Sequence, residues 1–427
     1  ANIYEKEGSD CWFSDDPQKF LGKKYNAKDY EKLSDIVEVW FDSGSTHSYV
    51  LETRKDLKWP ASMYLEGSDQ HRGWFHSSLL ESCGTRGRAP FEAVLTHGFV
   101  LDDQGRKMSK SLGNITAPQQ VLNEFGADIL RLWVIGSDYY DDLRIGKEIL
   151  IRHADHYRRL RNTLRYLLGA LNNFSDDEKI LYDKMPELEK WVLHRVYDLY
   201  NKICNHTENY RLHEIYKDVY NFCNIDLSAF YFDIRKDTLY CADINSVERR
   251  SCRTVMDILF SSITTWLAPI LCFTSEEAWQ NRYKNLNDSV HFHEYNKPEE
   301  DWMDSKVSVK WNKIRDLRMS VNNEIEEKRK AGEIGSSLEA HVEIYVTPEI
   351  KKEIKDVQFD EIAITSSFDI KDYNDNNYFS LEDIQGVKVD IEKSQGNKCN
   401  RCWKYSDIPS SKDICNRCEE VIELINN

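Results

Sequence analysis

The stretch from Tyr64 to Phe75 reads Tyr-Leu-Glu-Gly-Ser-Asp-Gln-His-Arg-Gly-Trp-Phe, a short apolar run followed directly by a polar turn that contains glycine. A helical pattern follows from Gln70 to about Cys83, and Ala93–Val100 is a second candidate strand. Upstream, Ile36–Phe41 predicts a further strand that ends in the turn Asp42–Ser45. The repeated order of strand, polar loop and helix predicts an α/β fold, in which sites form at the carboxyl ends of strands.

Residues 146–300 have a different, helical pattern. Apolar residues recur there at spacings of three and four, and the only glycines are Gly146 and Gly169. The run 254–273 contains an aspartate and Pro269, so it is typical of a buried helix pair rather than a membrane span. This part of the sequence therefore predicts a helix bundle.

The last part of the chain predicts a small α/β unit and a separate tail. A charged helix over 307–330 precedes a strand over 341–346, and the Asn/Asp-rich stretch 372–377 predicts a loop. We therefore expect a multidomain protein with an α/β domain (1–145), an all-α bundle (146–300), a small α/β junction unit (301–392) and a tail (393–427).

Composition excludes several classes of protein. With 427 residues, 41% hydrophobic and 30% charged, the chain has the balance of a globular protein of about three domains. Its net charge of −16 argues against a surface that binds nucleic acid throughout, although it leaves room for local basic patches. The N-terminus shows no signal peptide and begins with Ala1 rather than Met, so we expect a chain processed or cut from something longer.

Four of the 11 cysteines form a metal-ligand pattern. Cys399-x2-Cys402 and Cys415-x2-Cys418 are separated by 12 residues, a spacing that supplies four thiolates to one tetrahedral Zn²⁺. A tail of 35 residues buries little core, so metal binding should supply its folding energy and give a zinc-ribbon-like module. Two disulfides are the alternative. The other seven cysteines predict buried free thiols in a reducing compartment.

Two regions carry concentrated positive charge that suits RNA. Segment 393–418 has six Lys/Arg against two Asp, and Arg401 and Trp403 combine a cation with an aromatic ring, as in proteins that stack unpaired bases. Segment 152–165 has five Arg against one Asp, and three of them lie on one helix face: Arg158, Arg161 and Arg165. The alternatives are a solvated structural knob for the tail and intramolecular salt bridges for the helix.

A polar loop, Lys107-Met108-Ser109-Lys110-Ser111, follows a turn that contains Gly105. Two lysines three residues apart on such a loop can neutralise the charge that builds on a leaving pyrophosphate. The glycine spacing of a Walker P-loop is absent. A solvated basic turn is the alternative interpretation of the same residues.

Together these motifs resemble the class I aminoacyl-tRNA synthetases, and in particular their bacterial-type isoleucyl branch. The resemblance spans essentially the whole chain and rests on the following segments: Val39–Ser45, Tyr64–Phe75, Arg88–Pro90, Leu95–Phe99, Lys107–Ser111, Gly126–Asp128, Trp133, Tyr157–Asn162, Trp266–Pro269, Phe273–Trp279 and the cysteine tail. The family's other signature, His-x-Gly-His, is absent, and so is its editing domain. The resemblance therefore implies the C-terminal half of such an enzyme, beginning with the second half of its Rossmann-like catalytic domain.

The resemblance also implies roles for individual residues. It places Glu66, Gly67, Asp69 and Gln70 around the aminoacyl-adenylate, and Trp40 and Trp74 around the isoleucine side chain. Lys110 is the first choice for the ATP-contacting lysine and Lys107 the second. The alternatives are a turn in which Ser68 or Asp69 caps the following helix, and tryptophans that belong to the core.

The implied reaction is the attack of the isoleucine carboxylate on the α-phosphorus of Mg-ATP, followed by transfer of the isoleucyl group to tRNA(Ile). Positioning and charge neutralisation carry such a reaction, and no protein nucleophile is needed. The implied protein is a monomeric, cytoplasmic, non-membrane ligase that lacks half of its nucleotide fold and is inactive alone. A non-catalytic tRNA-binding derivative and a zinc-dependent nucleotidyl-binding enzyme of another family are the alternatives.

Overall fold

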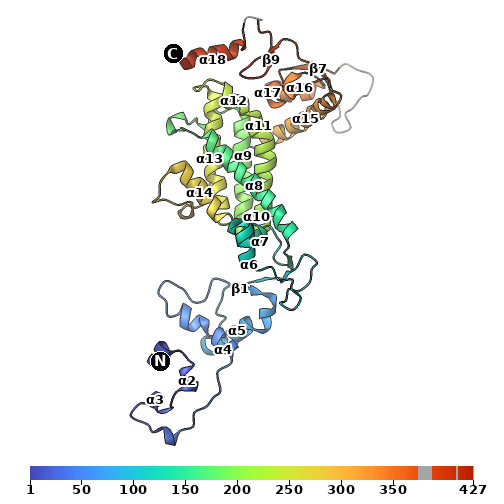
Figure 1. The fold of residues 1–427 in the computed structure, drawn as a ribbon. Coiled ribbons are helices and arrows are strands. Elements are labelled where there is room, and N and C mark those ends of the chain that lie inside the picture. The colour runs from blue at the N-terminus through green and yellow to red at the C-terminus, as the bar shows by residue number, and fades with distance from the viewer. Residues whose placement is uncertain (374–386, 410–411, 427) are drawn as a thin grey trace. The chain divides into compact units, whose positions relative to one another are not determined.

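The computed structural model describes residues 1–373, 387–409 and 412–426 (Figure 1). It divides into two compact units. Unit 1 comprises Ala1–Phe99 and Tyr139–Asp142, and unit 2 comprises Val100–Asp138 and Leu143–Asn427. The predicted first domain, 1–145, therefore contains residues of both units.

Unit 1 is built from short elements around one pair of parallel strands. Strand β1 pairs with β2 in the register Tyr64↔Val94 to Gly67↔His97. The elements are α1 (Asn2–Glu7), α2 (Cys11–Ser14), α3 (Gln18–Leu21), η1 (Ala27–Asp29), α4 (Val39–Gly44), η2 (His47–Leu51), β1 (Tyr64–Gly67), η3 (Ser68–Arg72), α5 (Trp74–Arg86) and β2 (Val94–His97). The predicted order of strand, polar turn and helix is confirmed for β1, η3 and α5.

The strand predicted over Ile36–Phe41 is wrong. Helix α4 begins at Val39 because the Glu38 carboxylate accepts a hydrogen bond from the Trp40 N–H at 2.6 Å and so caps the helix. The side chains of Ile36 and Val37 are 76% and 56% exposed. A run of apolar and β-branched residues is not sufficient for a strand here, because a capping carboxylate satisfies the backbone locally.

Unit 2 begins with strand β3 (Val100–Leu101), which pairs in parallel with β4 (Leu143–Arg144). The predicted strand over 93–100 is thus two strands, β2 and β3, separated at Gly98 and Phe99. Between β3 and β4 lie α6 (Pro118–Phe125) and α7 (Ala127–Ile135). Val121 of α6 and Trp133 of α7 form a small apolar cluster with Ile145 and Leu150, which follow β4, and Met108 packs against it.

The predicted helix bundle is confirmed, with α8, α9 and α13 packed together (Figure 1). Its helices are α8 (Lys147–Ala170), α9 (Glu187–Glu208), α10 (Leu212–Asn221), η6 (Phe222–Tyr231), α11 (Phe232–Ile234), α12 (Lys236–Cys241), α13 (Val247–Leu267) and α14 (Cys272–Tyr283), with short turns η4 (Asp176–Glu178), η5 (Tyr182–Lys184), η7 (Val290–Phe292) and η8 (Glu300–Trp302). Among the described residues, no helix is both long and apolar enough to cross a bilayer.

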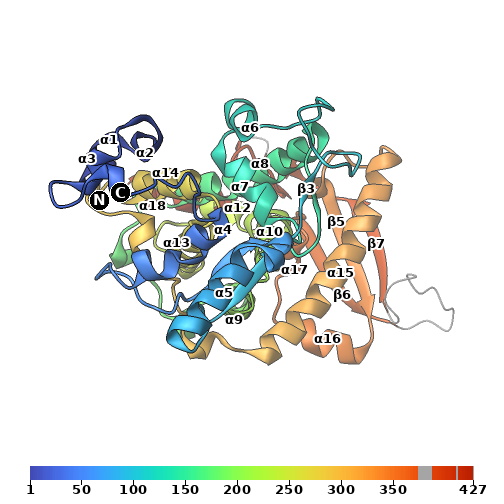
Figure 2. The same cartoon turned by 90° about the horizontal axis from the view of Figure 1, so that it is seen from below.

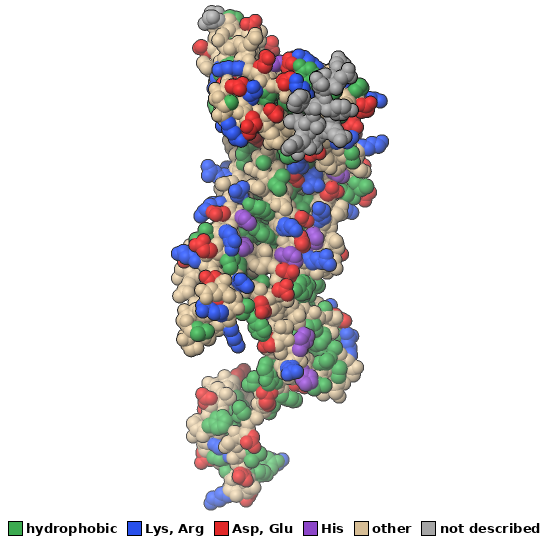
Figure 3. Space-filling view, turned by 90° about the vertical axis from the view of Figure 1, so that its right-hand side faces the viewer, with side chains coloured by type: hydrophobic (Ala, Val, Ile, Leu, Met, Phe, Trp, Pro, Cys, Tyr) green, Lys and Arg blue, Asp and Glu red, His purple; other side chains and the backbone are tan. Residues whose placement is uncertain are grey.

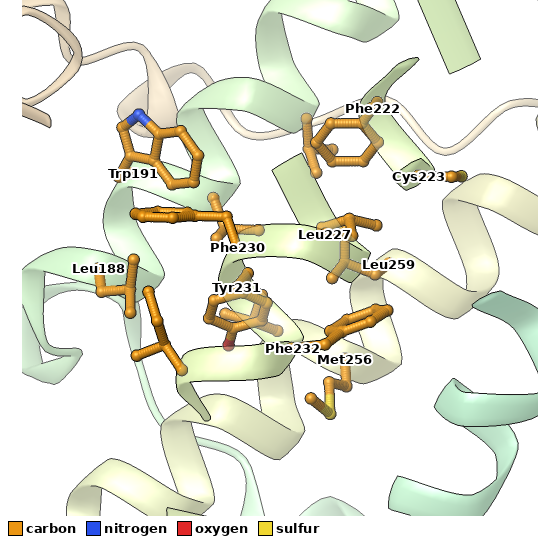
Figure 4. Packing of buried hydrophobic residues seen from close by; sticks show 14 of the residues in the cluster. Leu188, Trp191, Phe222, Cys223, Leu227, Phe230, Tyr231, Phe232, Met256 and Leu259 are labelled. Carbon is orange, nitrogen blue, oxygen red and sulfur yellow. The ribbon is translucent and has the colours of Figure 1, made fainter. Parts of the chain in front are cut away.

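The core of the bundle surrounds η6, a π-helical segment of ten residues that continues α10. Figure 4 shows Phe230 of η6 lying against Trp191, with Leu227 and Tyr231 in the same apolar cluster. Trp191, Leu227 and Tyr231 are completely buried. π-Helical segments are rare and mostly a single turn long, so a run of ten residues is unusual.

The junction region confirms the predicted helix and strand and shares the bundle's core. Helix α15 (Ser305–Lys330) packs on a sheet of order β6-β5-β7 (Figure 2). Its other elements are η9 (Ser337–Glu339), β5 (Ala340–Val346), α16 (Pro348–Ile354), α17 (Phe359–Ile362), β6 (Ser367–Asp372) and β7 (Val387–Lys393). Strand β6 ends at Asp372, and 374–377 of the predicted loop lies outside the described residues.

Candidate functional site

The predicted adenylate-binding residues lie at the carboxyl end of β1 in unit 1. Glu66 is exposed, and its Oε1 accepts the Gly67 N–H at 3.1 Å. The side chain of Gln70 caps α5, because its Oε1 accepts the Trp74 N–H at 3.0 Å. Asp69 is exposed and accepts from Gln70 Nε2 at 3.3 Å. The prediction that Ser68 or Asp69 caps this helix is therefore wrong.

The two predicted tryptophans differ in their surroundings. Trp74 stacks on Tyr64 with ring centroids 4.3 Å apart and donates its indole N–H to the Ser43 carbonyl at 2.9 Å. Trp40 is 41% exposed and lies over Gly73, where a Cβ atom would be 2.8 Å from its ring. Glycine at position 73 therefore permits this close approach. Trp74 has a packing role, whereas Trp40 presents a ring to solvent.

Both predicted loop lysines are exposed in unit 2. Arg106 pairs with Asp102 at 2.9 Å, whereas the ammonium groups of Lys107 and Lys110 pair with no carboxylate among the described residues. On a chain with net charge −16, two unpaired cations on one loop attract an anion. Both lysines belong to unit 2, whereas the residues predicted to hold the amino acid belong to unit 1.

The loop is held in shape from within. The buried carboxylate of Asp102 accepts from the Asn114 side chain at 2.9 Å and from the Arg106 N–H at 2.7 Å. Asn114 in turn accepts the Ser109 N–H at 3.0 Å. These hydrogen bonds, from Asn114 first and Arg106 second, lower the pKa of Asp102 to about 2. The contact between Asp102 and Asn114 could not be predicted, because nothing in their spacing indicates that they meet.

The predicted arginine face of α8 is largely engaged within the protein. Arg158 pairs with Asp155, and Arg161 pairs with Glu277 of α14 at 2.7 Å. Arg165 is exposed and forms no ion pair with a described residue. On the face shown in Figure 3, Lys/Arg and Asp/Glu side chains are interspersed rather than separated. Intramolecular salt bridges therefore account for two of the three predicted RNA contacts.

Arg159, which sequence analysis did not select, differs from its neighbours. Its Nη1 donates to the Asn224 side chain at 2.9 Å, and it forms no ion pair with a described residue. Only the packing of α8 against η6 brings Arg159 and Asn224 together, so no sequence signal was available to find it.

The four tail cysteines meet at one point. Their sulfur atoms all lie within 4.8 Å of one another, and Cys402 and Cys415 Sγ are 3.8 Å apart. That separation equals the edge of a tetrahedron with Zn–S bonds of about 2.3 Å. Burial raises the pKa of the Cys399 thiol, but backbone N–H groups of Cys402 and Cys415 outweigh this and lower it to about 6. All four thiols are free, so the arrangement fits a thiolate-bound metal and not two disulfides.

The tail, with strands β8 (Asn397–Lys398) and β9 (Tyr405–Ser406) and helix α18 (Asn416–Asn426), is docked on the bundle by charged side chains. Arg417 forms two hydrogen bonds with Asp237, at 2.6 and 2.8 Å. Arg401, a predicted RNA contact, donates to the Cys241 carbonyl at 2.7 Å. Trp403, by contrast, is 59% exposed and has a φ of 66°, a conformation that favours glycine.

Comparisons with known proteins identify two families that match separate parts of the chain. The family described as "tRNA synthetases class I (I, L, M and V)" matches residues 1–146, and "Anticodon-binding domain of tRNA ligase" matches residues 189–344. In fold, the chain is similar to a LeuRS of Agrobacterium radiobacter solved with tRNA and LeuAMS. The TM-score is 0.53 at 19% identity, over 64% of this chain and 34% of that one.

Curated relatives extend the match to nearly the whole chain. The isoleucine--tRNA ligase of Pelagibacter ubique is 53% identical over 96% of this chain and 44% of its own length. That of Zymomonas mobilis is 46% identical over 98% of this chain and 44% of its own length. That of Caldicellulosiruptor bescii is 44% identical over 99% of this chain and 47% of its own length. The chain thus spans a little under half the length of these relatives. Over nearly its whole length it is homologous to isoleucine--tRNA ligases, which are class I aminoacyl-tRNA synthetases.

Proposed function

We propose that the chain is the C-terminal part of an isoleucine--tRNA ligase. It contributes the lysine loop that contacts the leaving pyrophosphate during isoleucine activation, together with the RNA-binding domains. The observation that carries this proposal is the loop Lys107–Ser111, whose two lysines are exposed and unpaired among the described residues while Asp102 and Asn114 hold its backbone. A solvated basic turn has no need of such an internal scaffold.

In the proposed reaction, the isoleucine carboxylate attacks the α-phosphorus of Mg-ATP and pyrophosphate leaves. Lys110, with Lys107 second, neutralises the charge that develops on the leaving pyrophosphate. Glu66, Gly67, Asp69 and Gln70 contact the aminoacyl-adenylate, and the exposed ring of Trp40 contacts the isoleucine side chain. Trp74 supports this region through its stack on Tyr64.

The bundle and the tail are proposed to bind tRNA(Ile). Arg158, Arg161, Arg165, Arg401 and Trp403 are the predicted contacts, and the exposure of Arg165 and Trp403 favours these two. Trp403 keeps an aromatic side chain in a backbone conformation that costs about 1–3 kcal/mol for a non-glycine residue, which supports a role in stacking. One Zn²⁺ held by Cys399, Cys402, Cys415 and Cys418 supplies the fold of the tail. We place the protein in the cytoplasm, as a monomer.

Isoleucine-dependent exchange of pyrophosphate into ATP tests the catalytic part of the proposal. The chain alone should show no exchange, because the segment with the His-x-Gly-His signature is proposed to lie in an N-terminal part; adding that part should restore it. In the reconstituted enzyme, Lys110→Ala should lower exchange about 100-fold, because the lysine stabilises charge in the transition state. The control is Lys330→Ala, which removes an exposed lysine paired with Glu327 on α15.

Exchange by the chain alone, or an unchanged rate for Lys110→Ala, would contradict the proposal. The non-catalytic alternative predicts tRNA(Ile) binding with no exchange even when the N-terminal part is present. A pure RNA-binding protein would have no physical use for the anchored lysine loop, and for that reason we favour the enzyme.

A further inference from the structure

The three-stranded sheet of the junction region has one buried face and one face that is partly exposed. Alternate residues of β5 from Ala340 to Val346 are buried, and the side chains between them lie on the opposite, partly exposed face. A histidine and two carboxylates meet on this exposed face: His341 and Glu343 of β5, and Asp369 of β6. Nothing in the sequence indicates that they meet, because only the pairing of β5 with β6 brings them together.

The register of two parallel strands places the three side chains. His341 and Glu343 are two residues apart on β5 and so share a face, and Asp369 lies directly opposite Glu343. His341 Nε2 is 3.5 Å from Glu343 Oε1 and 3.8 Å from Asp369 Oδ2, and the three atoms all lie within 4.8 Å of one another. Atoms that bind a metal tetrahedrally at about 2.0–2.2 Å lie about 3.3–3.6 Å apart. Small rotations of these side chains are therefore enough to bring all three onto one ion.

The imidazole of His341 is oriented as in a metal ligand. Its Nδ1 is hydrogen-bonded to the Ser367 hydroxyl at 2.7 Å, and its other ring nitrogen, Nε2, faces the two carboxylates. Metal-binding histidines generally hold their second ring nitrogen in such a hydrogen bond, which fixes the tautomer and the orientation of the ring. The contact with Ser367 does not involve the carboxylates, and it leaves Nε2 available to an ion.

Negative charge is crowded on this face of the sheet. The register places three carboxylates side by side across the three strands, and like charges in directly opposite positions destabilise a sheet: Asp369, Glu343 and Asp390. Lys371 pairs with Glu343, and Lys388 pairs with Asp390 at 2.9 Å. The side chain of Asp369 is 59% exposed and has no lysine or arginine partner among the described residues. A divalent cation between Asp369 and Glu343 relieves the repulsion that remains.

We propose that His341, Glu343 and Asp369 bind one divalent transition-metal ion that joins β6 to β5. One imidazole and two carboxylates suit Zn²⁺ or Mn²⁺, whereas Mg²⁺ prefers oxygen ligands alone. The ammonium group of Lys371 leaves Glu343 when the metal binds. The inference is independent of the proposed function and of the four tail cysteines, because it concerns only side chains of the junction sheet.

The bound ion has a structural consequence, because β6 is an edge strand of the sheet. Ser366, the residue before β6, accepts the Tyr405 N–H of the tail at 2.6 Å. A metal that ties β6 to the central strand therefore also fixes the backbone on which β9 of the tail docks.

The test is titration of the full chain with Mn²⁺, followed by the loss of the electron paramagnetic resonance signal of free Mn²⁺. The chain is first given one equivalent of Zn²⁺, which the tail thiolates take up, and thiolates have little affinity for Mn²⁺. Excess Mg²⁺ suppresses binding to other surface carboxylates. A single Mn²⁺ should bind, and additional Zn²⁺ should displace it, since Zn²⁺ stands above Mn²⁺ in the order of affinities.

Variants assign the bound Mn²⁺ to this face. His341→Ala and Asp369→Asn should each raise Kd at least about tenfold, because each removes one of three ligands. Lys371→Met should lower Kd, because its ammonium group no longer competes with the metal for a carboxylate. The matched control is His293→Ala. It removes a histidine that contacts Asp288 at 2.9 Å but belongs to no group of three potential ligands among the described residues, and its Kd should equal that of the wild type.

Hydrogen exchange gives a second readout that does not depend on Mn²⁺. With Zn²⁺ at about ten times its Kd for this site, exchange of the amides in 367–372 should slow about tenfold in the wild type and stay unchanged in Asp369→Asn. Asp369 is exposed on an edge strand, so this variant decides the question even if His341→Ala does not fold. Equal Mn²⁺ affinity in the wild type and Asp369→Asn would overturn the proposal, as would loss of all Mn²⁺ binding in excess Mg²⁺.

Discussion

The bundle and unit 1 differ in how completely they bury their apolar side chains. In the bundle, Trp191, Trp266 and Phe260 have no exposed surface. In unit 1, whose residues are all described, the buried apolar side chains are few: Cys11, Tyr64, Phe75 and Tyr139. Val39 and Phe41 are instead 66% and 54% exposed, and they belong to a contiguous run of exposed apolar residues.

The large buried core and the predicted adenylate-binding residues therefore lie in different regions. Each Å² of apolar surface removed from water contributes about 25 cal/mol to stability, so the bundle is stabilised by its own core. Unit 1 leaves apolar surface uncovered, and contiguous exposed apolar residues mark surfaces that bind another segment. Unit 1 also carries Glu66 and Gln70, so the predicted adenylate-binding residues lie in the region with the smaller buried apolar core.

The strongest test compares one tryptophan from each region. Trp191→Ala should lower the free energy of unfolding by about 3–5 kcal/mol, because it empties a completely buried position that packs against Phe230 and Trp311. Trp40→Ala should cost about 1 kcal/mol or less, because its ring is 41% exposed. Urea unfolding followed by circular dichroism measures both. Similar losses of unfolding free energy for the two variants would contradict the difference between the bundle and unit 1.

A buried ion network offers the next test of the bundle. Arg235, 3% exposed, binds the completely buried Glu189 at 2.6 and 2.7 Å and also binds Glu361 of α17 at 2.5 Å. Arg235→Met should destabilise the bundle and its junction by about 3 kcal/mol, since Glu189 is left as an uncompensated buried charge. Thermal and urea unfolding measure the loss.

The double variant Glu189→Leu with Arg235→Met is the control for this network. It removes both charges and should recover at least half of the lost stability. If the double variant is less stable than Arg235→Met alone, the stabilisation does not come from charge compensation.

Removal of metal should affect the tail far more than the bundle. Chelation should abolish protection of amides in 397–406 and 416–426 from hydrogen exchange, because the thiolate–metal bonds supply the folding energy of this module. The bundle should lose only surface ion pairs such as Arg417–Asp237 and Lys404–Asp360. Its thermal midpoint should fall by about 2–4 °C for each kcal/mol that these pairs contribute. Elemental analysis should find one zinc per chain. A metal-free chain with a protected tail would contradict the zinc assignment.

The smallest effect concerns the lysine loop. Because the pKa of Asp102 is lowered from 3.8 to about 2, its hydrogen bonds stabilise the loop above about pH 4 and are lost as the pH falls to about 2. Protection of the Ser109 and Leu112 amides should fall over this range. In the Asp102→Asn variant, the protection of these amides should no longer depend on pH over this range. Full protection of the wild-type loop at pH 2 would show that Asp102 does not anchor it.

Much of the fold could be predicted because its signals are local. The apolar spacing over 146–300, the helix over 307–330 and the turn after Tyr64 each depend on residues close in the chain, and all are present in the structure. The prediction of a strand over 36–41 is wrong, because the Glu38 carboxylate caps a helix that begins within this apolar run.

Residue types and their local spacing are enough to predict the kind of chemistry: a lysine loop, an acidic turn with tryptophans, four metal-ligand cysteines and a basic helix. Which of these charges are free to act depends on contacts between segments that are far apart in the chain. Arg161 meets Glu277, Arg401 meets the Cys241 carbonyl, and Arg159 opens onto a cavity that η6 completes. The physical reason is that a charge is neutralised by whatever lies within a few ångströms of it, and those partners are 65–160 residues away along the chain.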